Sequence, residues 1–121
     1  GLDPLHYNFT GFFQPVDNPT VVNSVKAGQG VPIKFSLDGD QGLNIFAAGY
    51  PRIEFTSCPA GTVDSVETTV TAGNSSLSYD PTTDQYTYVW KTDKTWAGKC
   101  GTLQVVFNDG TLKTAMFKFT K

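Results

Sequence analysis

The last third of the chain alternates apolar and polar residues with a period of two. The alternation runs through residues 86–92, resumes at 102–107 and returns at 115–119, with an Asn-Asp-Gly turn sequence at 108–110 before the last run. Successive side chains of a strand point to opposite faces, so this period indicates strands with one buried face. The pattern therefore predicts three consecutive β-strands at the end of the chain.

Shorter runs of the same kind come earlier in the chain. They predict strands at residues 7–13, 21–25, 31–37, 52–57 and 66–71, with a brief pairing at 77–79. Ile53 and Phe55 take the inward positions of the fourth run, and Val66 and Val70 those of the fifth. Residues 43–49 are too few to define a period, so we expect either one helical turn or an irregular plug there.

Two residues in these runs predict local departures from a regular strand. Gly11 interrupts the rings at positions 7, 9 and 13, which indicates a bulge or close packing at that point. Pro32 lacks a backbone donor, so it belongs at the beginning of its strand or against an open edge.

The number and spacing of the strands predict the fold class. A chain of 121 residues fits one domain, spanning 1–121, with about seven to nine short strands and no amphipathic helix. Turn sequences recur about every 8–12 residues, as in a sandwich of two sheets. We favour an all-β, immunoglobulin-like antiparallel β-sandwich, because the strands after residue 86 resemble the closing strands of immunoglobulin-like modules. A small barrel is the alternative.

Cys58 and Cys100 are the two cysteines, and their spacing is not that of a metal site. We expect a structural disulfide; the alternative is a pair of buried free thiols. Cys58 ends the strand expected at 52–57, and Cys100 begins the strand expected at 102–107. These two strands would be antiparallel neighbours in one sheet. The bond would therefore join adjacent strands instead of crossing between the sheets. Few charges and abundant Thr, Gly and aromatic residues also suit an oxidising, extracytoplasmic location.

Composition and charge argue against several classes of partner. The formal net charge is −2 and the basic residues are not clustered, so we expect no nucleic acid. No apolar run approaches the roughly 20 residues that span a bilayer, so we expect no membrane span. Residues 1–5 lack the basic and apolar stretches of a signal peptide, and we expect the chain to be excised from a longer secreted protein.

A set of short motifs covers nearly the whole chain. Pro32, Lys34 and Phe35 form its centre, and the others lie at 11–19, 39–43, 45–51, 86–93 and 96–98, with Cys100 after them. Together they resemble the PxKF domain, a module typically found near the C-terminus of exported bacterial proteins, beside varied other domains. The resemblance implies an immunoglobulin-like module without known catalytic residues or an established ligand. Since the neighbours of Lys34 face inward, we expect Lys34 to point away from the core.

The chain offers few groups for catalysis. His6, the single histidine, lies in the approach to the first strand, where we expect a surface position. Asp38 with Asp40, and Asp80 with Asp84, fall in turns, where aspartate bonds to the local backbone. We therefore expect no enzyme activity, no catalytic residue and no cofactor. The alternative near Asp38 and Asp40 is a structural calcium ion, because oxygen ligands alternate there before a glycine.

Trp96 and Tyr50 are the candidates for stacking on a ligand, because both are expected in loops. Trp90 shares the parity of the rings at 86 and 88, so we expect it in the core. Rings with one polar atom suit a core, a sugar site or a protein interface, and the sequence does not separate these uses. Asn8 and Asn74 begin sequences of the glycosylation type, to which we assign no role.

These features favour a non-catalytic structural or interaction module, an accessory domain of a secreted or cell-surface bacterial protein. Its expected partners are neighbouring domains of its own parent chain, with carbohydrate or another surface protein as further candidates. The alternative function is a carbohydrate-binding module that uses exposed aromatic residues. That alternative predicts two or more exposed coplanar rings.

Overall fold

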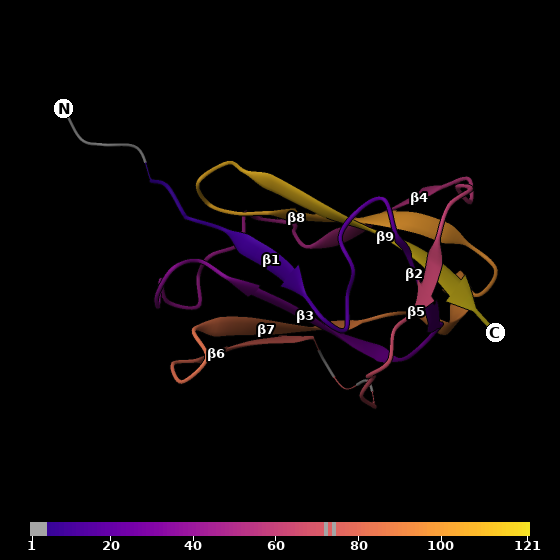
Figure 1. The fold of residues 1–121 in the computed structure, drawn as a ribbon, viewed down its shortest axis with the longest axis horizontal. Coiled ribbons are helices and arrows are strands. Elements are labelled where there is room, and N and C mark those ends of the chain that lie inside the picture. Colours follow the sequence, from indigo (N-terminus) through magenta and orange to yellow (C-terminus); the bar gives the residue numbers. More distant parts are fainter. Residues whose placement is uncertain (1–4, 72, 74) are drawn as a thin grey trace.

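The chain folds into two packed β-sheets in the computed structural model, which describes residues 5–71, 73 and 75–121 (Figure 1). The described residues form nine strands and one short 3-10 helix. In chain order these elements are β1 (Thr10–Phe13), β2 (Val22–Lys26), β3 (Gly30–Ser36), β4 (Arg52–Thr56), β5 (Val63–Ser65), β6 (Ser76–Asp80), β7 (Gln85–Lys91), η1 (Lys94–Trp96), β8 (Cys100–Val106) and β9 (Leu112–Thr120). Among the described residues, no helix has the length and apolar character needed to cross a bilayer.

The strand order confirms an immunoglobulin-like sandwich. One sheet has the order β1-β3-β7-β6, and the other has the order β4-β8-β9-β2-β5. With β1, β3, β7 and β6 as strands A, B, E and D, and β4, β8 and β9 as C, F and G, this is the order of a constant-type immunoglobulin domain. The expectation of antiparallel sheets needs one correction, because β2 pairs in parallel with both β9 and β5.

The predicted alternation identifies the core. Tyr86 and Trp90 of β7 and Leu103 of β8 are buried, while the residues at the alternate positions 87, 89, 102 and 104 are half-buried. Phe35 of β3 stacks on Tyr86 with ring centroids 5.5 Å apart, and it meets Phe107, at the end of β8, edge-on at 5.3 Å. Such aromatic pairs contribute about 0.5–1.5 kcal/mol each beyond the area they bury. Phe35 therefore ties its own sheet to the opposite one.

Residues 43–49 form an irregular plug, so the alternative of a helical turn is wrong. Ile45 is fully buried, and its carbonyl oxygen accepts a hydrogen bond of 2.8 Å from Asn108 N. Phe46 forms an isolated bridge with Phe107. The plug satisfies its backbone groups through the end of β8 and therefore needs no helix to do so.

The bulge predicted at Gly11 is present. The pairing of β1 with β3 shifts register between Gly11 and Phe13. A Cβ on Gly11 would lie 3.1 Å from Cβ of Phe35, and its φ of 145° is one that other residues rarely adopt. Glycine is thus required both by the close approach and by the backbone conformation.

Pro32 lies on an open stretch of the edge of β3, as predicted. Gly30 exchanges two backbone hydrogen bonds with Val70, and β1 pairs with β3 only as far as Lys34, so Pro32 lies between these contacts. Backbone groups two residues apart in a strand point to the same side. The missing donor of Pro32 therefore points at a part of the edge with which no described strand pairs, although the residue itself is buried.

Three expectations for the middle of the chain are wrong. Phe55 is 43% exposed and Val70 39% exposed, although both have inward parity. The strand expected at 66–71 is also absent, since the described strand in this region is β5. Val66 does pack against the core, half-buried. Parity defines a face of a sheet, and that face is buried only where another layer covers it.

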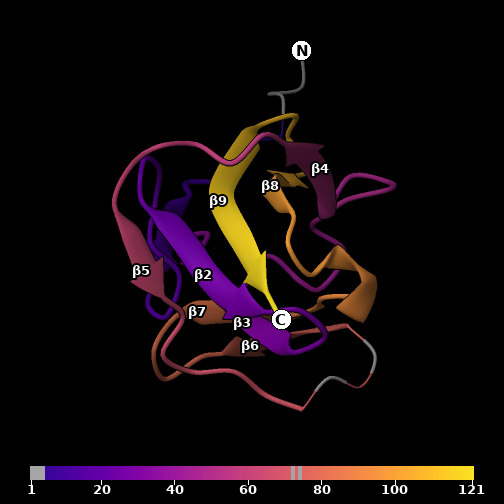
Figure 2. The ribbon, with the colours of Figure 1, turned by 90° about the vertical axis from the view of Figure 1, so that its right-hand side faces the viewer.

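The Cys58–Cys100 disulfide is present and fastens a crossing segment, residues 57–62, to the five-stranded sheet. Because β4 and β5 occupy opposite edges of this sheet, the crossing segment spans it. Figure 2 shows that it passes over the face turned away from the other sheet. At its far end Thr62 O accepts a hydrogen bond of 2.8 Å from Val22 N. The disulfide joins the end of β4 to β8, and these two strands are adjacent and antiparallel, as predicted.

Candidate functional site

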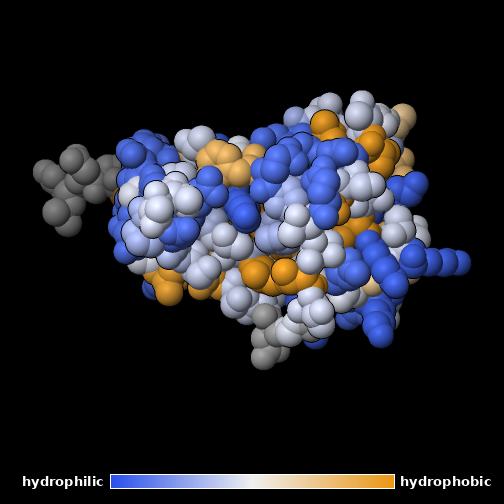
Figure 3. Space-filling model, turned by 60° about the horizontal axis from the view of Figure 1, so that its bottom comes forward, coloured by the Kyte–Doolittle hydropathy of each residue, from blue (hydrophilic) through white to orange (hydrophobic). Residues whose placement is uncertain are grey.

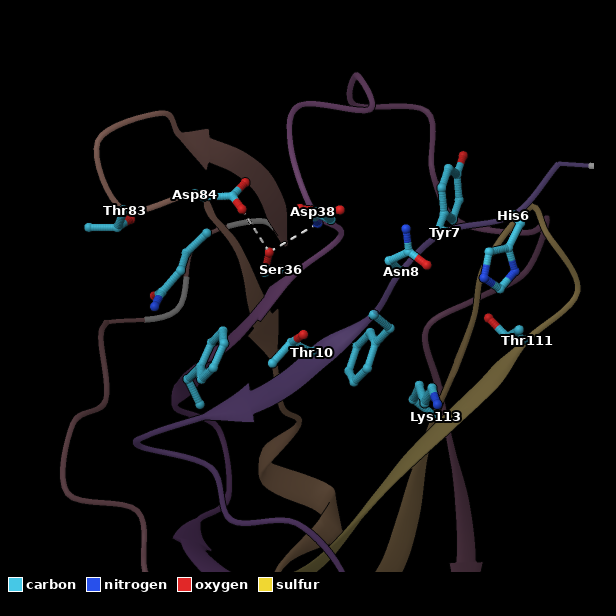
Figure 4. A pocket seen from close by; sticks show the side chains of 13 residues that line it. His6, Tyr7, Asn8, Thr10, Ser36, Asp38, Thr83, Asp84, Thr111 and Lys113 are labelled. Atoms are coloured by element: carbon cyan, nitrogen blue, oxygen red, sulfur yellow. Dashed lines mark hydrogen bonds between the residues drawn. The ribbon is translucent and has the colours of Figure 1, made fainter.

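A shallow groove of about 720 Å³ lies at the end of the sandwich where the chain enters β1 (Figure 4). Its lining residues are His6, Tyr7, Asn8, Phe9, Thr10, Phe13, Ser36, Asp38, Thr83, Asp84, Gln85, Thr111 and Lys113. They come from the approach to β1, the end of β3, the β6–β7 turn and the start of β9. This groove is the candidate site, because it brings polar side chains from separate segments into one hollow.

Asp84 fixes one wall of the groove. Its Oδ1 accepts hydrogen bonds from the Tyr79 hydroxyl at 2.8 Å and from Gly39 N at 2.9 Å, and its Oδ2 accepts one from the Ser36 hydroxyl at 3.1 Å. The bond from Tyr79 is the main reason that the pKa of Asp84 is lowered, and it raises the pKa of Tyr79 to about 12. The ionised carboxylate holds the β6–β7 turn against the end of β3.

The loop at residues 38–42 is closed by a buried tyrosine. The Tyr86 hydroxyl accepts a hydrogen bond of 2.7 Å from Gln41 N and donates one of 2.8 Å to Gly42 O. Asp40 Oδ1 accepts from Gly42 N at 2.8 Å, as turn-forming aspartates do. Within the described part of the chain, no three His, Cys, Asp or Glu side chains are grouped to hold a metal ion. The calcium alternative for this loop stays a prediction.

Two groove residues share an uncommon backbone conformation. Asp38 has a φ of 60° and Asp84 a φ of 54°, and they are the only described non-glycine residues with positive φ. Aspartate adopts this left-handed conformation more readily than most residues, because its side chain bonds to the nearby backbone. The left-handed backbone conformation of Asp38 and Asp84 therefore occurs in the wall of the groove that Asp84 holds.

The groove continues onto the outer face of the four-stranded sheet, which is mostly polar with small apolar patches (Figure 3). Thr10 pairs with Ser36, and the register of β3 with β7 places Ser36 beside Gln85. We call these three residues the outer row. In the next row Phe13 pairs with Lys34, which is half-buried and points away from the core, as expected.

Phe13 is a site residue that the sequence reasoning did not single out. Its position fits the alternation of rings at 7, 9 and 13, but the bulge at Gly11 shifts the register. Phe12 is therefore buried, at 5% exposure, while Phe13 is half-buried on the outer face. Two adjacent phenylalanines after a glycine were the available signal, because only one of them can face the core.

The two predicted stacking residues lie apart from each other and outside the groove. Trp96 packs against the rings of Phe119 and Phe55, with centroids 5.3 and 5.6 Å away. Tyr50 is half-buried, and the guanidinium of Arg52 lies 5.0 Å from its ring centroid. Tyr50 precedes β4 and Phe55 lies near its end, a separation of about 17 Å along the strand. The structure does not combine the two rings into one platform, and their ligand-stacking role stays a prediction.

The single histidine and the two glycosylation-type asparagines are the remaining polar candidates from the sequence. His6 and Asn8 are exposed at the groove, which confirms the surface position expected for the histidine. Figure 4 shows both on the side of the groove away from Asp84 and Ser36. Asn74 lies outside the described residues.

Comparison with protein-family models, with curated proteins and with solved structures gives no match to this chain. The fold itself defines the class: a disulfide-linked, immunoglobulin-like β-sandwich. The resemblance to the PxKF domain stays a prediction.

Proposed function

We propose that this chain is a non-catalytic structural module of an exported bacterial protein, which spaces and docks the domains on either side of it. The position of the chain ends carries this proposal. The segment leading into β1 and the C-terminus lie at opposite ends of the longest axis (Figure 1). Domains joined to the two ends would be held about one module length apart. The resemblance to a module found beside varied other domains supports the same role.

The disulfide supports a secreted or cell-surface location. Disulfides persist in oxidising compartments and are rare in the cytosol. Cys58 is exposed, so reductants would have access to the bond. An extracytoplasmic location suits a sheet whose crossing segment depends on that bond.

The state of Asp84 supports a structural use of the groove over acid catalysis. Its carboxylate is committed to three hydrogen bonds within the fold, and its pKa is lowered, chiefly by the bond from Tyr79. A general acid needs a carboxyl whose pKa is raised toward the working pH. Asp84 is therefore suited to holding the wall of the groove in place and not to donating a proton.

Energy transfer between two fluorescent proteins, one fused before the chain and one after it, tests the spacing role. We expect one narrow distance distribution, with less transfer than in a control pair joined directly by a short Gly-Ser linker. A broad distribution, or transfer as strong as in the control pair, would contradict a rigid module with its ends at opposite poles.

A further inference from the structure

In the groove, polar side chains without hydrogen bonds to other described residues lie on both sides of Ser36, whose hydroxyl is hydrogen-bonded within the fold. The Ser36 hydroxyl bonds to Asp84 and to Asp38 N. The side chains of Thr10 and Gln85, its neighbours in the outer row, bond to no other described residue, and neither does the exposed carboxylate of Asp38. A hydroxyl, an amide and a carboxylate therefore remain available to a ligand along this wall.

Phe13 supplies an apolar surface beside these groups. It lies one row away from the outer row, and it is half-buried, so part of its ring faces the groove. None of the ring pairs among the described residues includes Phe13, whereas Phe9 and Phe12 both pack on Phe35. The Phe13 ring is thus the aromatic surface of the groove that the core does not use.

The wall that carries these groups is formed before any ligand binds. Asp84 bonds to Gly39 N and to the Ser36 hydroxyl, and the buried Tyr86 closes the loop that follows. A wall already held in one conformation loses little conformational entropy on binding.

A neutral, hydroxyl-rich ligand matches this combination. Each sugar hydroxyl both donates and accepts, so it pairs equally with hydroxyl, amide and carboxylate groups. The apolar face of a sugar ring packs on an aromatic side chain. The groove volume of about 720 Å³ also lies within the range of small-molecule sites, about 300–1,000 Å³.

Charge and edge geometry disfavour two other ligand classes. The carboxylates of Asp38 and Asp84 outnumber the one lysine of the groove, Lys113, so a phosphate-rich ligand would be repelled. A peptide that adds as a strand needs a regular free edge, and β1 has four residues with a bulge after Gly11.

We propose that this groove binds a neutral oligosaccharide, with one sugar ring packed on Phe13 and the hydroxyls of that ring and its neighbours bonded to Thr10, Gln85 and Asp38. This binding function goes beyond the spacing role. It also places sugar recognition on residues other than the two predicted stacking rings.

An array of neutral oligosaccharides built from glucose, galactose, mannose and N-acetylglucosamine tests the proposal. We expect the wild-type protein to bind at least one of them, and Phe13→Ala to weaken that binding about tenfold, the size of one lost aromatic contact. Gln85→Ala removes an amide that the fold does not use, so it should weaken binding with an unchanged urea midpoint. Phe55→Ala removes a 43% exposed ring outside the groove and is the matched control, expected to bind as the wild type does.

Failure of the folded wild-type protein to bind any arrayed glycan would overturn the proposal, as would glycan binding that both groove variants retain in full. Binding to an array of basic peptides in place of glycans, weakened in both groove variants, would also overturn it and would assign the groove to a protein partner. If Phe13→Ala does not fold, Gln85→Ala decides the outcome. The energy-transfer measurement does not involve these residues, so failure on the array leaves the spacing role intact.

Discussion

The contribution of Asp84 to stability depends on pH, because its hydrogen bonds favour the ionised carboxylate. Its pKa is lowered, chiefly by the bond from Tyr79. A carboxyl of this kind stabilises the fold above its unfolded pKa and loses that contribution as pH falls through its folded pKa. We expect Asp84→Asn, which tolerates the positive φ, to lower the urea midpoint near neutral pH, and we expect this loss to shrink as the pH falls below about 4. A loss of constant size over that range would contradict this role.

The contribution of Asp64 to stability has the opposite pH dependence, because the pKa of its carboxyl is raised. The largest cause is its hydrogen bond with the Asp17 carboxyl, followed by desolvation and by the charges of Asp17 and Glu67. Asp17 Oδ2 is buried without a hydrogen-bond partner among the described residues, so a proton on Asp64 supplies the missing donor. A raised folded pKa gives stability that is present below the unfolded pKa and is lost as pH rises through the folded pKa.

Asp64→Asn is therefore expected to raise the urea midpoint near neutral pH, since its amide donates at every pH. The gain should shrink toward about pH 4, because the raised pKa lets the wild-type carboxyl take up its own proton as the pH falls. Urea unfolding at the two pH values measures the difference. Asp38→Asn is the control, an exposed aspartate elsewhere in the chain. A lower midpoint for Asp64→Asn near neutral pH would rule out the shared proton.

The burial of single residues was predictable only in part. Tyr86 and Trp90 are buried as their parity predicts, because the second sheet covers β7. Phe55 has inward parity on an edge strand and is exposed, and Phe13 is turned outward by the bulge at Gly11. Local alternation says which face a side chain takes and nothing about where the covering layer ends. The ring of the candidate site was therefore not identified from the sequence.

At the scale of elements, Gly101 sets how closely β4 approaches β8. A Cβ on Gly101 would lie 2.9 Å from Glu54 O and from Ile53 Cδ1, both in β4. We expect Gly101→Ala to push β4 outward and to lower the free energy of unfolding by about 1–3 kcal/mol, the usual cost of overpacking. Gly73→Ala is the control, because an added Cβ there meets nothing within 4 Å. Equal urea midpoints for the two variants would contradict the close approach.

The disulfide stabilises the fold through the loop that it closes. Cys58 and Cys100 are 42 residues apart, a loop worth about 4 kcal/mol in the chain-entropy description. Replacing both with alanine should lower the free energy of unfolding by this order, measured by urea unfolding with tryptophan fluorescence. Because Trp90 is 4% exposed in the core, its emission reports whether the variant still folds. A loss below about 1 kcal/mol would show that the bond restrains little.

The strands were more predictable than their partners. Alternation within one segment is enough to predict β7, β8 and β9, because a period of two belongs to each strand alone. The parallel pairing of β2 with β9 depends on how distant segments meet, so no local pattern contains it. The region at 66–71 has a strand-like pattern, yet Val70 forms only an isolated bridge with Gly30 at the edge of β3.

At the scale of the whole molecule, the groove and the C-terminus lie at opposite ends (Figure 1). A ligand in the groove would therefore leave the C-terminal end free for a neighbouring domain. The regular spacing of turn sequences along the chain predicted the sandwich, because that spacing reflects the number and length of the strands. The groove was not predictable in the same way, because its walls come from four segments that only the fold brings together.

Both proposed functions depend on the two-sheet sandwich, whose most distinctive feature is β2 in parallel beside β9. Nuclear Overhauser contacts in the isotope-labelled protein test this feature most directly. The structure predicts contacts between Val22 and Met116 at one end of the pair and between Val25 and Phe119 at the other, with both chains running in the same direction. Contacts in the reverse order, or none between residues 22–26 and 116–120, would contradict the fold.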